Sequence, residues 1–256
     1  MNRQRTMRHR AADLMRAPVR AFVLGIALAA CGPAVARDSI LDTRSYSRVP
    51  PSPDGTGIVY MGRETAGVMG HEGAAWLERD ERAVEERPDL LLRALALEPG
   101  MTVADIGAGT GYYSWRMAER VGASGRVLAV DVQPEMLSLL DREMKKHDAR
   151  NVKGILGTTH DPRLPASAVD LVLMVDVYHE FDHPREMLDA IARSLKPDGR
   201  VVFVEYRAED AGVPIKPHHK MSEAQVRKEA AASGLVWKET IATLPWQHVI
   251  VFGKSR

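Results

Sequence analysis

From about residue 100 onward, short apolar runs alternate with segments in which apolar residues recur at helical spacing. The continuous run at 169–175 (VDLVLMV) is typical of a strand that is covered on both faces. After Pro134, Met136, Leu140 and Met144 fall on one face of a helix. The pattern predicts strands at 101–106, 125–130, 152–156, 169–175, 200–205, 235–242 and 248–252. It predicts helices at 76–97 (interrupted at Pro88), at 112–121, from 134, at 184–195 and at 222–233.

Strands and helices that alternate at this spacing predict an α/β fold, with a mostly parallel sheet and helices on both of its sides. Ligands of such sheets bind beyond the carboxyl ends of the strands. We therefore expect the chemistry to lie in the polar segments that follow the predicted strands, namely Asp105–Gly111, Asp131, Asp161, Asp176–Asp182 and Glu205–Tyr206.

The N-terminal segment has the pattern of a signal peptide. Six arginines precede an apolar run at 21–30 (AFVLGIALAA), which would make about 15 Å of helix, roughly half of a bilayer core. Cleavage after the A-x-A site at 34–36 would remove residues 1–36. The residues before Cys31 instead resemble a lipobox, which predicts removal of 1–30 and a lipid on Cys31. A cytoplasmic protein is the alternative, and a start at Met15 would leave the export prediction unchanged.

Composition divides the rest of the chain and excludes some functions. Residues 37–57 are rich in Pro, Gly, Ser and Thr, which predicts a linker, and 58–256 then form one domain with room for a sizeable core. The 45% of hydrophobic and 27% of charged residues argue against wholesale disorder. A net charge of +1 gives no basis for nucleic-acid binding. A single cysteine excludes an internal disulfide and a zinc site built on cysteines.

A glycine-rich loop follows the first predicted strand. It reads D-x-G-x-G-x-G from Asp105 to Gly111, and Tyr112 occupies the place of the last glycine in a dinucleotide G-x-G-x-x-G fingerprint. Glycines at alternating positions let the backbone turn tightly and approach a ligand closely. Asp131 lies 20 residues after Gly111, at the end of the second predicted strand. A carboxylate at that place can accept both ribose hydroxyls of a nucleoside.

This loop is similar to motif I of class I S-adenosylmethionine-dependent methyltransferases. The segments 170–181 and 195–200 (LKPDGR) also resemble the family, and the resemblance covers about 100–254. It implies a Rossmann-like, doubly wound, mostly parallel seven-stranded sheet with an antiparallel last strand. It also implies a methyltransferase with S-adenosylmethionine as cofactor. The cofactor-binding residues that it implies are Asp105, Gly107, Gly109, Gly111, Asp131, Asp161 and Asp176.

The third strand end departs from the family pattern. The family often has G-D-A after this strand, whereas residues 157–161 read GTTHD. Asp161 either serves the adenine from a shifted position or caps a turn before Pro162. For Asp105, a structural role is the alternative, in which its carboxylate holds amides of the glycine loop.

Candidates for the acceptor side lie at the later strand ends. A general base assists methyl transfer when the acceptor carries a proton. We expect His179 and Glu205 to be catalytic, and Glu180 and Tyr206 are further candidates. Substrate-side candidates are Tyr113, Tyr178 and Tyr206. His218 and His219 lie in a loop at 213–220, which is either a solvated loop or a lid.

Residues 179–183 (HEFDH) match the H-E-x-x-H signature of zinc metalloproteases. That signature needs both histidines on one helix face, and Pro184 disfavours helical geometry at His183. No metal site is therefore expected, although an exported zinc hydrolase that uses His179, Glu180 and His183 stays as a remote alternative. A non-catalytic S-adenosylmethionine-binding module is a second alternative.

The sequence thus predicts a periplasmic or lipid-anchored methyltransferase, monomeric, that acts on a small-molecule or lipid-like acceptor. Its acceptor is not identified by any sequence pattern. Export raises a question of supply, because S-adenosylmethionine is made in the cytoplasm.

Overall fold

The computed structural model describes residues 46–254. The predicted signal peptide, its two cleavage sites and Cys31 lie outside the described residues. Within 46–254, no helix has the length and apolar character needed to cross a bilayer. The strands are β1 (Tyr46–Arg48), β2 (Gly55–Tyr60), β3 (Arg63–Ala66), β4 (Thr102–Ile106), β5 (Arg126–Asp131), β6 (Val152–Leu156), β7 (Val169–Val175), β8 (Leu195–Tyr206), β9 (Leu235–Ile241) and β10 (Gln247–Lys254). The α-helices are α1 (Ala74–Leu77), α2 (Arg82–Glu85), α3 (Pro88–Ala94), α4 (Ser114–Val121), α5 (Pro134–Lys146), α6 (Pro184–Ser194) and α7 (Glu223–Ala232), and the short 3₁₀ helices are η1 (His71–Gly73), η2 (Tyr178–Glu180) and η3 (Pro217–His219).

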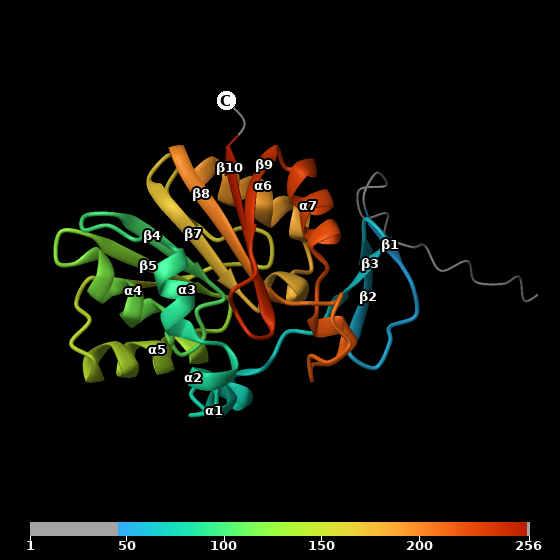
Figure 1. Cartoon of the computed structure of the whole chain (residues 1–256), viewed down its shortest axis with the longest axis horizontal. Coiled ribbons are helices and arrows are strands. Elements are labelled where there is room, and N and C mark those ends of the chain that lie inside the picture. Colours follow the sequence, from blue (N-terminus) through green and yellow to red (C-terminus); the bar gives the residue numbers. More distant parts are fainter. Residues whose placement is uncertain (1–45, 255–256) are drawn as a thin grey trace, which may run out of the picture. The chain divides into compact units, whose positions relative to one another are not determined.

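Seven of these strands form one sheet in the order β6-β5-β4-β7-β8-β10-β9 (Figure 1). Pairing is parallel from β6 to β8, and β10 runs antiparallel to both β8 and β9. The order reverses between β4 and β7, which is the switch point at which ligands of doubly wound sheets bind. The predicted α/β fold, Rossmann-like with an antiparallel C-terminal part, is confirmed.

Successive residues of the central strands face opposite sides of the sheet, and both sides are buried. Leu171 and Leu173 of β7 pack with α3 and α4, whereas Val172 and Met174 pack with α6 and α7. Helix α5 packs on β5 and β6 at the edge. All four of these β7 side chains are inaccessible to solvent, which explains why this strand reads as a continuous apolar run.

The seven predicted strands of the main sheet correspond to β4 to β10, with bounds that agree within two residues for all but β8. Strand β8 begins at Leu195, five residues before the predicted start at 200. The predicted helix at 76–97 is instead three short helices. Arg87 has a left-handed backbone (φ 50°), and Pro88 follows as the first residue of α3. Since a left-handed residue cannot continue a helix, this pair separates α2 from α3.

A linker is expected at 37–57, and the structure differs from it over the part that it describes, residues 46–57. Residues 46–48 and 55–57 lie in β1 and β2, which form a three-stranded antiparallel sheet with β3. Glu64 holds the β1–β2 connection, because its carboxylate accepts the N–H groups of Ser52 and Gly57. The prolines and glycines that predict a linker therefore shape tight turns between short strands.

This small sheet is joined to the main domain by buried polar contacts. The Arg63 guanidinium donates two hydrogen bonds to Glu229 of α7 and one to the carbonyl of His179. Tyr178 donates its hydroxyl to Glu229 as well. Tyr46 donates its hydroxyl to Glu186 of α6. The N-terminal strands are thus part of the same packed unit as the main sheet.

Candidate active site

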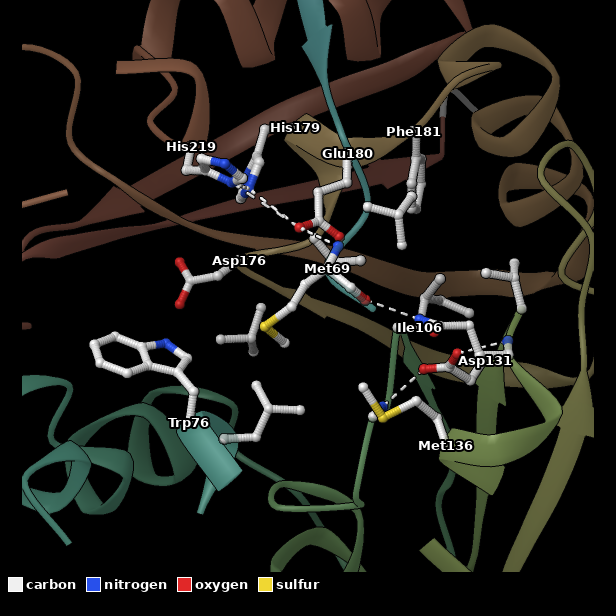
Figure 2. A pocket seen from close by; sticks show the side chains of 18 of the residues that line it. Met69, Trp76, Ile106, Asp131, Met136, Asp176, His179, Glu180, Phe181 and His219 are labelled. Atoms are coloured by element: carbon white, nitrogen blue, oxygen red, sulfur yellow. Dashed lines mark hydrogen bonds and ion pairs between the residues drawn. The ribbon is translucent and has the colours of Figure 1, made fainter. Parts of the chain in front are cut away.

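A cavity of about 610 Å³ lies at the carboxyl ends of β4, β5, β7 and β8 (Figure 2). Two further parts of the chain line it, and we call them the N-terminal wall (residues 68–86) and the C-terminal wall (residues 214–219). Apolar side chains make up much of its surface, among them Met69, Trp76, Ile106 and Met136. Mostly apolar cavities of this size with a few polar groups are typical of small-molecule sites.

The glycine loop contributes bare backbone to the cavity surface. Gly107 and Gly109 line the cavity, and both have left-handed φ values of 68° and 54°. A Cβ atom at Gly107 would lie 2.3 Å from Val177, and one at Gly109 would lie 2.6 Å from Leu77. Glycine is therefore the residue that fits this turn, and its backbone reaches the cavity surface with no side chain of its own. Gly111 has a φ of 90° but does not line the cavity.

Asp131 lies at the cavity where β5 ends. One carboxylate oxygen accepts the N–H of Gly109, and the other accepts the N–H of Gln133. Burial raises the pKa of this carboxyl above its usual range. The bonds orient Asp131 toward the cavity and leave each oxygen a lone pair for a ligand hydroxyl.

Besides Gly111, two predicted cofactor residues lie away from the cavity surface. Asp105 is buried beneath the loop, where it accepts the Ser114 hydroxyl at 2.6 Å, and burial raises its pKa to about 6. The amide of Gly109 is therefore held by Asp131 and not by Asp105. Asp161 accepts the N–H of Arg163 in a turn, while the nearby cavity surface comes from Thr158 and Thr159.

Asp176 directly follows β7, has a left-handed conformation (φ 49°) and lines the cavity. Gln247 donates to one carboxylate oxygen at 2.6 Å. The other oxygen is buried and has no hydrogen-bond partner among residues 46–254. Burial, with Glu86 nearby, raises the pKa of Asp176 well above its usual range. A buried, unpaired acceptor at the cavity indicates a ligand that donates to it.

The N-terminal wall adds charges that the sequence analysis did not identify. Arg82 donates to Glu86 at 2.6 Å, and both side chains are almost fully buried. Arg79 also pairs with Glu86 and stacks over the half-exposed ring of Trp76. All four side chains line the cavity near Asp176. Their spacing in the sequence follows no motif, which is why only the fold identifies them.

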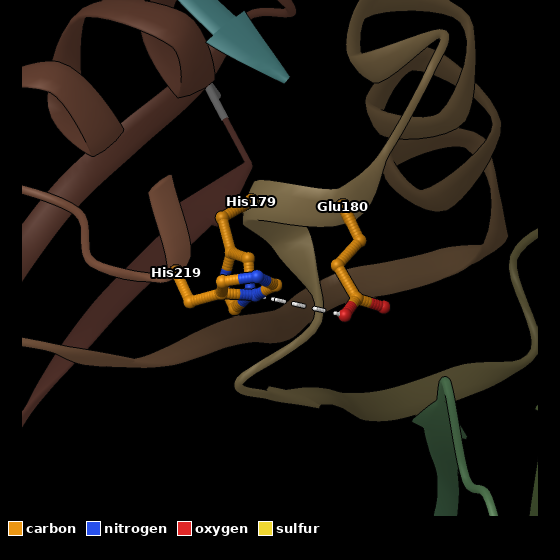
Figure 3. Close-up of side chains that lie close together, drawn as sticks. All are labelled: His179, Glu180 and His219. Carbon is orange, nitrogen blue, oxygen red and sulfur yellow. Dashed lines mark hydrogen bonds and ion pairs between the residues drawn. The ribbon is translucent and has the colours of Figure 1, made fainter. Parts of the chain in front are cut away.

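At the other end of the cavity, three polar side chains surround His179, and Figure 3 shows two of them, Glu180 and His219. Glu205 contacts its Nδ1 at 2.6 Å, and His219 contacts its Nε2 at 3.1 Å. Glu180 lies 4.0 Å from both imidazoles. Glu205 also accepts the N–H of Tyr178, which fixes the carboxylate. The predicted pair of His179 and Glu205 is brought together, and His219 of the 213–220 loop lines the cavity beside it.

These contacts shift the ionisation of the cluster. Burial lowers the pKa of His179, but the Glu205 carboxylate outweighs that effect, so the pKa is raised overall. Burial raises the pKa of Glu180 to about 7. Burial and the neighbouring His179 lower the pKa of His219. Glu180 therefore changes its protonation near neutral pH, as groups that move protons often do.

The remaining candidates divide between cavity and core. Tyr206 lines the cavity and donates its hydroxyl to Glu86. Tyr113 and Tyr178 are buried away from the cavity surface, Tyr178 among the apolar residues between the sheet and α6. His183 lies apart from the His179 cluster and packs edge-on against His160. The H-E-x-x-H geometry is thus absent, because η2 ends at Glu180 and α6 begins at Pro184.

Comparison with known proteins gives a family for most of the chain. A family model described as a methyltransferase domain matches residues 97–252. Arsenite methyltransferase of Halobacterium salinarum is 35% identical over 108 residues, which cover 42% of this chain and 28% of that protein. The ubiquinone/menaquinone biosynthesis C-methyltransferase UbiE of Ectopseudomonas mendocina is 31% identical over 111 residues, which cover 43% of each chain. The chain thus spans less than half the length of these relatives.

Solved structures share the fold. The crystal structure of a SAM-dependent methyltransferase from Aquifex aeolicus superimposes with a TM-score of 0.68 and 24% sequence identity. The match covers 72% of this chain and 98% of the other. The β1–β3 sheet precedes the region that the family model matches.

Proposed function

We propose, on the premise that this chain belongs to the methyltransferase-domain family, that it transfers a methyl group from S-adenosylmethionine to a small-molecule acceptor. S-adenosylmethionine is the methyl donor of the family. The observation that carries the proposal is the bare backbone of Gly107 and Gly109 at the cavity surface, with the Asp131 carboxylate beside it in the same cavity.

The residues present fit the methyl donor. Asp131 would accept the ribose hydroxyls, and the backbone at Gly107 and Gly109 would lie against the nucleoside. The unpaired oxygen of Asp176 would accept from the ammonium group of the methionine part. Arg82, a buried cation that lines the cavity, would pair with its carboxylate. When bound, S-adenosylmethionine supplies a methyl group on a positively charged sulfur, which needs only a nucleophile.

The polar end of the cavity is the proposed acceptor side. Glu205 accepts a hydrogen bond from Nδ1–H of His179, so Nε2 presents its lone pair toward His219 and the cavity. In this form Nε2 withdraws a proton from an acceptor hydroxyl or amine, and Glu205 stabilises the imidazolium that results. The chain would thereby activate an acceptor whose hydroxyl or amine is a poor nucleophile until its proton is removed.

Ligand binding by the full chain tests the proposal. We expect S-adenosylmethionine and S-adenosylhomocysteine to bind with micromolar Kd in calorimetry, and Asp131→Ala to weaken both by about 10-fold or more, since two hydrogen bonds to a charged acceptor are lost. Asp161→Ala is the matched control, because this aspartate lies at the neighbouring strand end but outside the cavity. Absent binding, or an equal loss in both variants, would contradict the proposal.

We also propose that the protein is exported, as a soluble periplasmic protein or anchored by a lipid at Cys31. The arginine-rich start, the apolar run at 21–30 and the position of Cys31 support this. Cell fractionation of the full chain and of Cys31→Ser tests it. Release of only the variant from membranes would support the lipid, and intact protein found in the cytosol alone would contradict export.

A further inference from the structure

Three side chains with metal-ligating atoms converge at one wall of the cavity, and no part of the proposed methyl transfer requires all three. They are His179 and Glu180 of η2 and His219 of η3. Their nearest ligand atoms all lie within 4.8 Å of one another. The two imidazole nitrogens are 3.1 Å apart, and each is 4.0 Å from Oε1 of Glu180 (Figure 3).

We propose that His179 Nε2, His219 Nδ1 and the Glu180 carboxylate bind a divalent cation of the zinc class. These separations of 3.1, 4.0 and 4.0 Å leave a point that is equally far from all three ligand atoms, at about 2.2 Å from each. This distance is close to the 2.0–2.2 Å of zinc bonds to histidine and carboxylate. Two imidazoles and one carboxylate suit Zn²⁺ or Co²⁺, whereas Mg²⁺ and Ca²⁺ prefer a set of oxygen ligands.

The surroundings hold each ligand in place. Glu205 contacts Nδ1 of His179, which is the carboxylate–histidine arrangement that fixes the tautomer of a metal ligand. Oε1 of Glu180 accepts the N–H of Met69 from the N-terminal wall. Arg63 donates to the carbonyl of His179 and so anchors the turn that carries two of the ligands. Contacts that orient ligands before the ion arrives favour tight binding.

The charge of the site fits a divalent ion. His179 and Glu205 are almost fully buried, and Glu180 is largely so. Glu180 and Glu205 supply two carboxylates near the cation, while the charge of Arg63 is paired with Glu229. Burial of a dication without such compensation would be costly.

The three ligands come from the protein, and the cavity provides the fourth position. All three residues line the cavity that also contains Asp131. Zinc sites with three protein ligands and an open position act on a bound water or substrate. An acceptor oxygen at that position would have its pKa lowered by the ion, which would replace His179 as the means of activation. The site is distinct from the H-E-x-x-H prediction, because His219 takes the place expected for His183.

Titration with Co²⁺ tests the site, because the ion gives visible absorption that reports its ligands. The full chain carries Cys31→Ser in every sample, which removes the only thiol. We expect one equivalent of Co²⁺ to bind and Zn²⁺ to displace it. His219→Ala and Glu180→Gln should each weaken Co²⁺ binding by about 100-fold or more, and Glu205→Gln by about 10- to 100-fold.

His218→Ala is the matched control, because its imidazole contacts Ser52 and Glu64 and not the cluster. It should bind Co²⁺ like the parent. Absence of saturable binding at one equivalent, or unchanged affinity in both His219→Ala and Glu180→Gln, would overturn the metal site. S-adenosylmethionine binding is measured on the same preparation, so loss of cofactor binding with intact Co²⁺ binding would overturn only the proposed function.

Discussion

At the scale of single residues, the cavity depends on carboxylates with different surroundings. Asp131 accepts two N–H groups, Asp105 accepts one hydroxyl, and Asp176 leaves one oxygen unpaired. Burial raises the pKa of all three, so the folded protein retains acidic groups at a cost in stability. Such a cost is expected where a site is arranged for a ligand rather than for stability.

Asp105 allows this cost to be measured. Its pKa of about 6 in the folded protein exceeds the usual 3.8, so the folded state binds the proton more tightly than the unfolded state. Stability should therefore fall as the pH rises from about 4 to 6, and the cost should persist above pH 6. We compare the free energies of unfolding of Asp105→Asn and wild type at pH 4 and at pH 8, measured by urea unfolding. We expect this difference to shift in favour of the variant by about 1 to 3 kcal/mol from pH 4 to pH 8. An equal effect of the substitution at both pH values would contradict this.

At the scale of elements, the turn between β4 and α4 is constrained by left-handed glycines and close packing. It places Gly107 against Val177 from the end of β7, across the switch point of the sheet. This contact fixes the distance between the glycine loop and the η2 turn. The geometry of the cofactor side is thus linked to that of the His179 cluster.

Gly107→Ala tests the link, and Gly234→Ala is its control. Both glycines have similar positive φ values, 68° and 73°, but a Cβ at Gly234 meets nothing within 4 Å. Both variants should lose about 1 kcal/mol through backbone strain, and Gly107→Ala should lose about 1 to 3 kcal/mol more through overpacking. Urea unfolding and S-adenosylmethionine affinity are the measurements. Adding Val177→Ala should recover part of the loss, and equal losses in the two glycine variants would contradict the argument.

At the scale of the whole described unit, the β1–β3 sheet is held by a buried ion pair. Arg63 and Glu229 are 13% and 0% exposed and form two hydrogen bonds. The same guanidinium donates to the His179 carbonyl, so Arg63 stabilises both the small sheet and the proposed acceptor side. Removing one partner of a buried pair leaves an uncompensated charge.

We expect Arg63→Met to lower the free energy of unfolding by about 3 to 5 kcal/mol, because it leaves Glu229 buried without a cation. Adding Glu229→Gln should restore part of that loss. Arg93→Met is the control, because its pair with Asp89 is half exposed and should contribute less than about 1 kcal/mol. Thermal unfolding of the four proteins measures the differences, and a loss in Arg63→Met no larger than in the control would contradict the prediction.

The central strands of the main sheet could be predicted because they are local apolar runs that are buried on both faces, as for β7. The glycine loop and Asp131 were recognisable because their spacing is local and chemically specific. The β1–β3 sheet was not, because its strands are short and its turns carry the composition of a linker. Arg82, Glu86 and His219 reach the cavity only through contacts distant in sequence, which no pattern within one segment encodes.

The Arg63–Glu229 pair also bears on how the chain is made. Its partners are 166 residues apart, and Arg63 leaves the ribosome well before α7 exists. The β1–β3 strands therefore cannot pack in their final position during most of translation, because their contact with α7 forms only after that helix has been synthesised. Any cellular factor that binds these early strands would have a long interval in which to do so. A chaperone captured on stalled nascent chains that end before Glu229, and released from longer ones, would reveal that interval.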